Sequence, residues 1–406
     1  MGHGTETPCS LSGVFGEDLL TEVLRGKLRE LAQTVLEAEI DDALAAARHE
    51  RAEQRAGFRH GTKSRTLHTS FGSTELAVPR ARLMRADGTS QEFQSRLLPR
   101  YERRTRSLDE TVVSLYLSGT NTRRVERAMR PMLSNAPLSR SVVSRLVAQL
   151  GEHQKEWKAR KLGLVTYVYL YLDAKMFAVR VGHKVRQIPV LVALGVRLDG
   201  QKELLAFEAF AKESEPAWTE FLEGLVQRGL NRPKLGIIDG HAGLHKAVEI
   251  TWPKLPTQRC TVHKLRNLEQ KCPADLYPEM KEDYHAIVDA TSLDTAREAW
   301  KRFVAKWQKS VPSVVASLDE AGDELLTFFR FPKEQWKCLR TTNPIERLNC
   351  EFERRVKTQC SLPNEDAAML LLFGLIASGQ IRFRKIDGWE KIVEVVHNES
   401  LTKVAS

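Results

Sequence analysis

The chain has 406 residues, of which 42% are hydrophobic and 28% are charged, and its formal net charge is +10. Six cysteines are too sparse for a small secreted disulfide scaffold, and they lack the paired spacing of a zinc ribbon. No apolar stretch approaches the roughly 18 residues of a membrane span, and residues 1–12 lack a secretory pattern, so we expect a cytoplasmic protein of two to four domains.

The positive charge is concentrated early in the chain. Residues 1–50 carry 4 basic and 10 acidic side chains, whereas residues 51–160 carry 22 basic and 10 acidic ones. This second stretch is where a polyanion such as nucleic acid is expected to bind. The alternative is an arginine-rich surface that only keeps the protein soluble.

The first two segments differ in their pattern. Between residues 18 and 55, apolar side chains recur at helical spacing, so we predict a helical segment over 1–56 that contacts solvent or a second copy of the chain. In 57–106, glycines interrupt the helical pattern and residues 76–79 read as a short strand. We expect DNA contacts from the basic side chains of this segment, namely Arg59, Lys63, Arg65, Arg80 and Arg82.

A three-helix segment is predicted over 107–155, with helices at 109–118, 122–130 and 140–152. Gly119 is placed to end the first helix. The arrangement resembles a helix-turn-helix module, although a structural three-helix linker has the same pattern. The residues that would face DNA are Arg123, Arg124, Arg140 and Arg145.

An α/β domain is predicted to begin at residue 160 and to run to 270. Its expected elements are strands at 164–172, 188–196, 203–210 and 234–238, with a helix at 215–228 before the last strand. Gly200 lies at a predicted hairpin turn. This order is that of a ribonuclease-H-like mixed sheet core, and other α/β folds share it. Residues 271–338 then read as an all-helical insertion, and 339–406 as the continued domain.

Two aspartates stand directly after predicted strands. Asp173 follows one apolar run and Asp239 follows Leu235-Gly236-Ile237-Ile238. An ionised carboxylate where a buried strand ends is costly unless it is paired, solvated or bound to a cation. The pair therefore suggests a metal site. The simpler interpretation is that each aspartate caps the turn that follows it.

Glu346 adds a third carboxylate, in the first turn of a predicted helix. Asn343 is placed to cap this helix, and Pro344 suits its first turn. Asn349, Glu353 and Arg354 fall on nearly the same helical face as Glu346. That face could hold a cation and a phosphate, or it could simply be solvated.

Several stretches together resemble the IS256 family of bacterial transposases, within the Mutator-like group of aspartate-aspartate-glutamate transposases. The resemblance covers most of residues 165–360, with weaker similarity at Gly57-Phe58-Arg59 and Val78-Pro79-Arg80. The stretches that carry it are Leu172-Asp173-Ala174, Ala193-Leu194-Gly195, Arg228-Gly229-Leu230, Asp239-Gly240-His241-Ala242-Gly243-Leu244, Gln258-Arg259-Cys260-Thr261-Val262-His263 and Thr341-Thr342-Asn343-Pro344-Ile345-Glu346-Arg347.

The resemblance implies that Asp173, Asp239 and Glu346 form the catalytic triad of an interrupted ribonuclease-H-like fold. Three such carboxylates could hold two divalent cations per site, and we expect Mg²⁺, with Mn²⁺ as a substitute, because hard cations prefer carboxylate oxygen. The implied partners are double-stranded DNA, as terminal inverted repeats and target, and at least one further copy of the chain on DNA. The implied cell compartment is the bacterial cytoplasm, at the nucleoid when DNA is bound.

Two features remain open beside the resemblance. Cys260 and His263 match a family motif, but two ligands do not close a zinc site, so His263 is either a phosphate donor or a core histidine. Glu353 stands where the family often has a basic residue, which leaves Arg354 or Lys357 for a phosphate contact. The rival functions are a nuclease that cuts without joining and a non-catalytic DNA-binding repressor.

Overall fold

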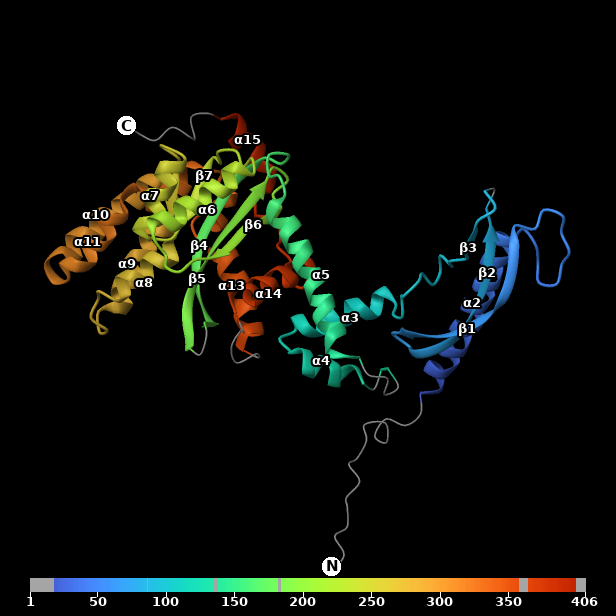
Figure 1. Cartoon of the computed structure of the whole chain (residues 1–406). Helices are drawn as coiled ribbons and strands as arrows, with labels where there is room; N and C mark the ends of the chain where they lie inside the picture. Colours follow the sequence, from blue (N-terminus) through green and yellow to red (C-terminus); the bar gives the residue numbers. More distant parts are fainter. Residues whose placement is uncertain are drawn as a thin grey trace, which may run out of the picture. The chain divides into compact units, whose positions relative to one another are not determined.

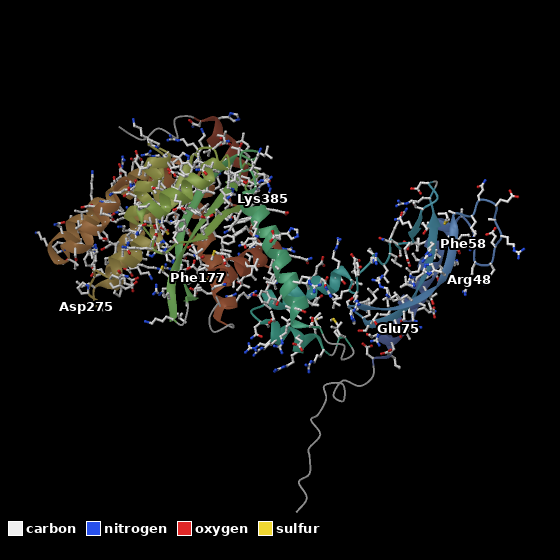
Figure 2. The ribbon with its side chains drawn as sticks, viewed as in Figure 1. Arg48, Phe58, Glu75, Phe177, Asp275 and Lys385 are labelled. Atoms are coloured by element: carbon white, nitrogen blue, oxygen red, sulfur yellow. The ribbon has the colours of Figure 1, made fainter. Side chains whose placement is uncertain are left out.

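The computed structural model describes residues 18–85, 87–130, 132–133, 138–181, 184–357 and 364–398. The chain divides into two compact units, Met1–Ala148 and Gln149–Ser406. Figure 1 labels the elements of each unit, and Figure 2 adds the described side chains. Among the described residues, no helix combines the length and apolarity needed to cross a membrane.

The first unit begins with a long helix packed on a hairpin. Helix α2 (Leu19–Leu44) lies against β1 (Gly57–Thr69) and β2 (Gly72–Met84), and β3 (Ser90–Glu92) extends the sheet at its edge. The side chains that join helix and sheet are Leu36, Ile40, Leu44, Leu76 and Ala81. The strand predicted at 76–79 is part of a longer strand of 13 residues, so its predicted extent was wrong. Its ends were missed because they contain polar residues, which lie on an exposed face of the strand.

The three helices predicted next are present. They are α3 (Arg106–Leu117), α4 (Thr122–Met129) and α5 (Arg140–Ala159), and α5 runs seven residues beyond its predicted end. Gly119 has a φ of 94° after α3, a conformation that glycine adopts without strain. The helices share a small core formed by Leu108, Val112, Val125, Met129, Leu133, Leu138, Val143 and Leu146.

The second unit is built on a five-stranded mixed sheet in the order β6-β5-β4-β7-β8. The strands are β4 (Tyr167–Val181), β5 (Lys184–Arg197), β6 (Lys202–Ala209), β7 (Leu235–Ile238) and β8 (Thr257–Arg259). Strand β5 runs antiparallel to both of its neighbours, β4 and β6, whereas β7 pairs in parallel with β4 and β8 in parallel with β7. The predicted mixed sheet is confirmed. The three-residue strand β8 was not predicted, because it is too short to show periodicity.

Helices cover both faces of this sheet (Figure 1). On one face lie α6 (Glu215–Gln227) and α7 (Ala242–Thr251), whose Trp218 and Leu244 pack with Leu170 and Leu172 of β4. On the other face, the hydroxyls of Tyr169 and Tyr171 donate to the Gln335 side chain (2.5 Å) and the Cys338 carbonyl (3.0 Å). The even-numbered residues Leu170 and Leu172 of β4 therefore face α6 and α7, and the odd-numbered residues Tyr169 and Tyr171 face the opposite layer.

The expected all-helical stretch between the strands and the Glu346 helix is present. It contains α8 (Thr261–Glu269), α9 (Tyr277–Val288), α10 (Leu293–Ser310), α11 (Pro312–Ala321) and α12 (Trp336–Leu339), with short 3-10 turns at Gly322–Leu325, Thr327–Arg330 and Lys333–Gln335. It has its own core around Tyr284, Phe303 and Trp307. After it come α13 (Asn343–Lys357), α14 (Glu365–Ala377), a turn at Trp389–Lys391 and α15 (Ile392–His397).

Candidate active site

The strand register brings two of the predicted acidic residues together. The parallel strands β4 and β7 pair Leu172 with Ile238. Asp173 and Asp239 each follow that pair by one residue, on strands that lie about 4.8 Å apart in a sheet. Asp173 is 5% exposed, while Asp239 is half-buried and accepts a hydrogen bond from the His241 backbone N–H (3.0 Å).

The prediction that Asp173 ends a strand was wrong. Strand β4 continues to Val181, and Asp173 itself pairs with Val192 of β5. What ends at this level is β7, which leaves one side of β4 without a partner strand beyond Leu172. The opening beside Asp173 therefore comes from the short neighbouring strand, and not from the end of its own strand.

Helix α13 packs on the face of β4 that carries Asp173, Lys175 and Phe177. The Asn349 side chain donates from Nδ2 to the Asp173 carboxylate (3.4 Å). Lys175 and Phe177, further along β4, also contact this helix. Lys175 pairs with Glu353 at 2.9 Å, and the rings of Phe177 and Phe352 are 4.5 Å apart, edge to face. Residues 173, 175 and 177 alternate onto one face of the strand, so each meets the helix that carries Glu346.

Glu346 occupies the first turn of α13, as predicted. The Thr342 carbonyl accepts hydrogen bonds from the Ile345 and Glu346 backbone N–H groups, so Thr342, rather than Asn343, stands at the start of the helical ladder. The Glu346 carboxylate contacts Arg266 Nη1 (3.0 Å) and His263 Nε2 (3.5 Å), both from α8.

The remaining predicted residues of α13 have different surroundings. Asn343 is exposed at the start of the helix, and Asn349 is buried against Asp173. Arg354 pairs with Glu351 on the surface, with 67% of its side chain exposed. The Lys357 side chain lies outside the described residues. Among the described side chains of this group, Asn349 alone contacts an acidic residue of the candidate site.

Cys260 and His263 connect α8 to the start of α13. The buried Cys260 thiol accepts hydrogen bonds from the Thr342 backbone N–H and hydroxyl, both at 3.4 Å. The hydrogen bond to Cys260 raises the pKa of His263 to about 9, and the charges of Cys260, Asp173 and Asp239 add to this effect. Burial opposes ionisation of Cys260, but His263 and Thr342 together lower its pKa. His263 is thus a cation among carboxylates.

The two ends of the helical insertion are joined by hydrogen bonds beside the candidate site. The Thr261 backbone N–H and hydroxyl both donate to the Arg340 carbonyl, at 2.9 and 3.0 Å. Thr261 begins α8, and Arg340 immediately follows α12. The chain therefore leaves and re-enters the site at a single point.

Electrostatics couples the three carboxylates. Burial, together with the charges of Asp239 and Glu346, raises the pKa of Asp173 to about 7, although the charge of His263 opposes this shift. The three carboxylates offer negatively charged oxygen atoms, which are the ligands that a hard divalent cation prefers. Within the described part of the chain, however, no three Asp, Glu, His or Cys side chains stand close enough together to hold a metal ion in this conformation. Arg266 and His263 instead neutralise Glu346.

The basic residues predicted in the β-hairpin fall into two groups. Arg59 is bound by Glu37 (2.8 Å) and Asp41 of α2, and Arg65 donates to the carbonyls of Leu98, Pro99 and Glu102. These two side chains hold the unit together. Arg80 pairs with Glu92 (2.7 Å), whereas Lys63 and Arg82 are exposed.

The basic residues predicted in the three-helix segment are all exposed. Arg123 and Arg124 lie in the first turn of α4, where the Asn121 side chain caps the helix by accepting from the Arg124 N–H (3.0 Å). Arg140 and Arg145 lie on the first turns of α5, with Arg140 Nε 3.5 Å from Glu126. These surfaces leave basic groups open to a ligand.

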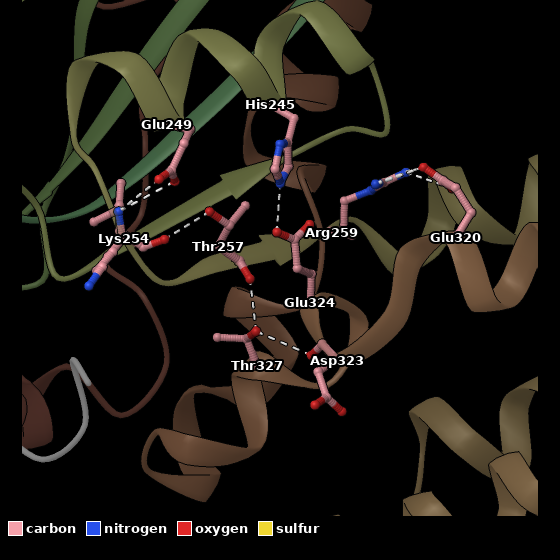
Figure 3. A network of polar contacts seen from close by, with 10 residues as sticks. His245, Glu249, Lys254, Thr257, Arg259, Glu320, Asp323, Glu324 and Thr327 are labelled. Atoms are coloured by element: carbon pink, nitrogen blue, oxygen red, sulfur yellow. Dashed lines mark hydrogen bonds and ion pairs between the residues drawn. The ribbon is translucent and has the colours of Figure 1, made fainter. Parts of the chain in front are cut away.

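Sequence reasoning missed the basic residues beside the acidic ones. Arg266 follows His263 by three residues, a helical spacing that places both on one face and could have revealed it. Arg259 and Lys264 gave no such signal, because buried basic side chains with partners far along the chain leave no local pattern. Arg259 binds Glu320 in Figure 3, and His245 and Glu324 form a neighbouring pair at 2.7 Å.

The chain is similar to known proteins over most of its length. Residues 14–385 match the family described as "Transposase, Mutator family". The chain is 36% identical to the transposase for insertion sequence element ISRM5 of Rhizobium meliloti, over 87% of this chain and 86% of that protein. It is 32% identical to the transposase for insertion sequence element IS256 in transposon Tn4001 of Staphylococcus aureus, over 91% and 93%.

Two further comparisons differ in strength. The transposase for insertion sequence element IS1081 of Mycobacterium tuberculosis is 32% identical, over 88% of this chain and 85% of that protein. Among solved structures, the Drosophila P element transposase strand transfer complex matches 70% of this chain and 79% of its own, at 11% identity and a TM-score of 0.30. The structural likeness is too weak to support an argument about the site.

Proposed function

Because the chain belongs to the Mutator family of transposases, we propose that Asp173, Asp239 and Glu346 carry out its DNA chemistry. The family membership expected from the sequence motifs is confirmed, and the protein is a transposase of an insertion sequence element. A transposase cleaves DNA strands and transfers them to a target. The assignment of that chemistry to these three side chains is the proposal.

One observation carries the assignment. The pairing of Leu172 with Ile238 sets Asp173 and Asp239 side by side, and Asn349 of the Glu346 helix donates to Asp173. The strand order β6-β5-β4-β7-β8, with the first three antiparallel and the last two parallel to β4, further supports a ribonuclease-H-like core. In that fold the acidic residues meet where the two central parallel strands lie together.

The carboxylates would hold two divalent cations, Mg²⁺ or Mn²⁺, which when bound activate the attacking oxygen and stabilise the departing one. The strand pairing of β4 with β5 holds Asp173 in place, whereas Glu346 would have to give up its contacts with Arg266 and His263 to join Asp173 and Asp239 in holding a cation. Arg266 and protonated His263 would then be able to bind the phosphate whose bond is broken, because both side chains are cations beside the carboxylates.

We further propose that the first unit binds the terminal inverted repeats. Its exposed arginines on α4 and α5 support this role, since most contacts to DNA go to phosphates. Helix α2 leaves Leu20, Leu24 and Leu31 exposed, which supports contact with a second copy of the chain when two DNA ends are joined. Cross-linking of the full chain with and without DNA would test the copy number.

The test of the catalytic assignment is Asp239→Asn, which keeps the size of the side chain and removes its charge. We expect cleavage of terminal-repeat DNA to fall by at least about a thousandfold, because carboxylate ligands supply several kcal/mol of transition-state stabilisation. Asp199→Asn, in the exposed β5–β6 turn, is the matched control and should cleave normally. Full activity of Asp239→Asn would contradict the assignment.

Two rival activities are separated by the products. Pre-cleaved ends are supplied to the wild-type protein together with a target plasmid and Mg²⁺. A transposase joins the ends to the plasmid, whereas a nuclease gives cut DNA alone and a repressor gives neither. The joined product is the expected result, because the relatives are transposases of insertion sequence elements.

A further inference from the structure

A cavity of about 420 Å³ opens beside the loop that follows Asp239. Its lining comes from four parts of the second unit, namely the turn at Gly240, strand β8, helix α8 with the residues that follow it, and helix α11 of the helical insertion. Ligand pockets in proteins measure roughly 300–1,000 Å³, so the cavity is large enough for one nucleotide unit of a DNA strand.

Two buried cations form the wall of this cavity. The side chains of Arg259 and Lys264 are 7% and 2% exposed, while Glu320, which faces both of them, is 56% exposed. Arg259 contacts both oxygens of Glu320 at 3.0 and 3.1 Å, as Figure 3 shows, and Lys264 Nζ contacts one at 2.7 Å. The cations therefore belong to the buried wall, and the carboxylate that pairs with them is more than half exposed to solvent.

The charges in this group do not balance. Arg259 and Lys264 bring two positive charges and Glu320 brings one negative charge, and Lys271 adds a further cation to the lining. Arg259 Nε is buried and has no hydrogen-bond partner among the described residues. Burial of an uncompensated cation is costly, so the cluster has capacity for a more highly charged anion than one carboxylate.

The guanidinium of Arg259 lies directly against the backbone next to Asp239. A Cβ atom at Gly240 would come within 2.7 Å of Arg259 Nη2, which a side chain at that position could not tolerate unless the guanidinium moved. An anion bound by Arg259 would thus lie beside the loop that carries one of the proposed catalytic carboxylates.

We propose that this cavity is a binding site for a backbone phosphate of the DNA substrate, and that the Glu320 carboxylate occupies the phosphate position when DNA is absent. Carboxylate and phosphate present the same pair of oxygens to an arginine, so one can replace the other on the same donors. Lys264 and Arg259 hold the phosphate, and Glu320 turns outward into solvent. The proposal rests on the DNA chemistry proposed above and extends the contact to the strand beside the cut.

The decisive variant is Glu320→Gln, with Glu279→Gln as its matched control. Glu279 is also 56% exposed and also pairs with a lysine, Lys306 at 2.6 Å, but it does not line the cavity. Binding to a short fluorescent duplex of arbitrary sequence is measured by titration, with the full chain and without divalent metal. This binding test is independent of the cleavage test, because it contains no divalent metal and measures affinity alone. If Asp239→Asn still cleaved DNA, the catalytic assignment would fail and the binding result would stand.

We expect Glu320→Gln to bind the duplex about threefold to tenfold more tightly than the wild type, since it removes a competitor for the phosphate position. Glu279→Gln should change the affinity by less than about twofold. Inorganic phosphate should raise the unfolding temperature of Glu320→Gln more than that of the wild type, because a ligand of the folded state stabilises it. Equal affinities for the two variants would overturn the proposal.

A second variant preserves the charge. Arg259→Lys keeps the positive charge but loses the paired N–H groups that grip a phosphate, and Arg302→Lys on the exposed face of α10 is its control. The proposal predicts weaker duplex binding for Arg259→Lys only, at temperatures where circular dichroism shows both variants folded. If the cluster is merely an ion pair that joins α11 to the sheet, Arg259→Lys loses thermal stability without losing affinity, and the proposal fails.

Discussion

Asp173 is the residue at which burial and charge conflict most directly. Burial and the neighbouring Asp239 and Glu346 hold its pKa at about 7, well above the ordinary value of 3.8. Below pH 3.8 the group is neutral in both the folded and unfolded chain. Between pH 3.8 and 7 the unfolded chain loses the proton while the folded chain keeps it, so the free energy of unfolding falls as the pH rises. Above pH 7 this penalty is constant.

The expected consequence is that Asp173→Asn stabilises the metal-free protein. At pH 8 the gain should be on the order of 2–4 kcal/mol, because one pKa unit corresponds to about 1.36 kcal/mol, and it should vanish near pH 4. Urea unfolding in the presence of a chelator measures both values. Added Mg²⁺ should then stabilise the wild type and not the variant. Equal stability of the two proteins at pH 8 would contradict the electrostatic description of this site.

At the scale of elements, the β5–β6 hairpin depends on Gly200. Its φ is 78°, and its carbonyl accepts a hydrogen bond from the Ile386 N–H (3.0 Å) of the C-terminal segment. A Cβ atom there would meet the Trp389 Cβ at 2.2 Å. Gly200→Ala should therefore cost about 1–3 kcal/mol in urea unfolding. Gly224→Ala in α6, where a Cβ meets nothing, should instead be neutral or slightly stabilising.

The same scale shows what the sequence could and could not predict. The Gly200 turn, the strands around it and the first turn of α13 follow from local signals, namely a glycine, apolar runs rich in residues that favour strands, and Pro344 at the start of the helix. The length of β4 beyond Asp173 did not, because its outer half is a ribbon of only two strands with mixed polarity. The contacts of Glu346 with Arg266 and His263 join residues about 80 positions apart, and no local pattern records them.

At the scale of the whole molecule, charge and chemistry are divided between two units. The basic excess of residues 51–160 lies mainly in the first unit, and the three candidate catalytic carboxylates lie in the second. The sequence could indicate this division through its charge distribution. It could not show that Arg59 and Arg65 serve the interior of the first unit, because partners such as Glu37 and the Leu98 carbonyl are set by folding.

This division predicts that DNA affinity can be lowered without harming the chemistry. Replacing Arg123 and Arg124 together by alanine should weaken duplex binding and reduce the slope of log affinity against log salt by about 1.8, for two lost phosphate contacts. The cleavage rate at saturating DNA should be unchanged. The paired control is alanine at Lys301 and Arg302, two adjacent exposed cations of the second unit. An equal loss of slope in both pairs would rule out a specific role for α4.

The closure of the helical insertion by Thr261 and Arg340 has a consequence for how the protein tolerates change. The chain leaves and re-enters the α/β domain at this one hydrogen-bonded junction, and the Arg259–Glu320 ion pair ties α11 to strand β8 as a second contact. Residues added or removed far from these contacts, for example between α9 and α10, should leave the distance from Asp239 to Glu346 unchanged. The helical insertion can thus change in length to suit a new partner, while the spacing of the three candidate catalytic carboxylates is kept.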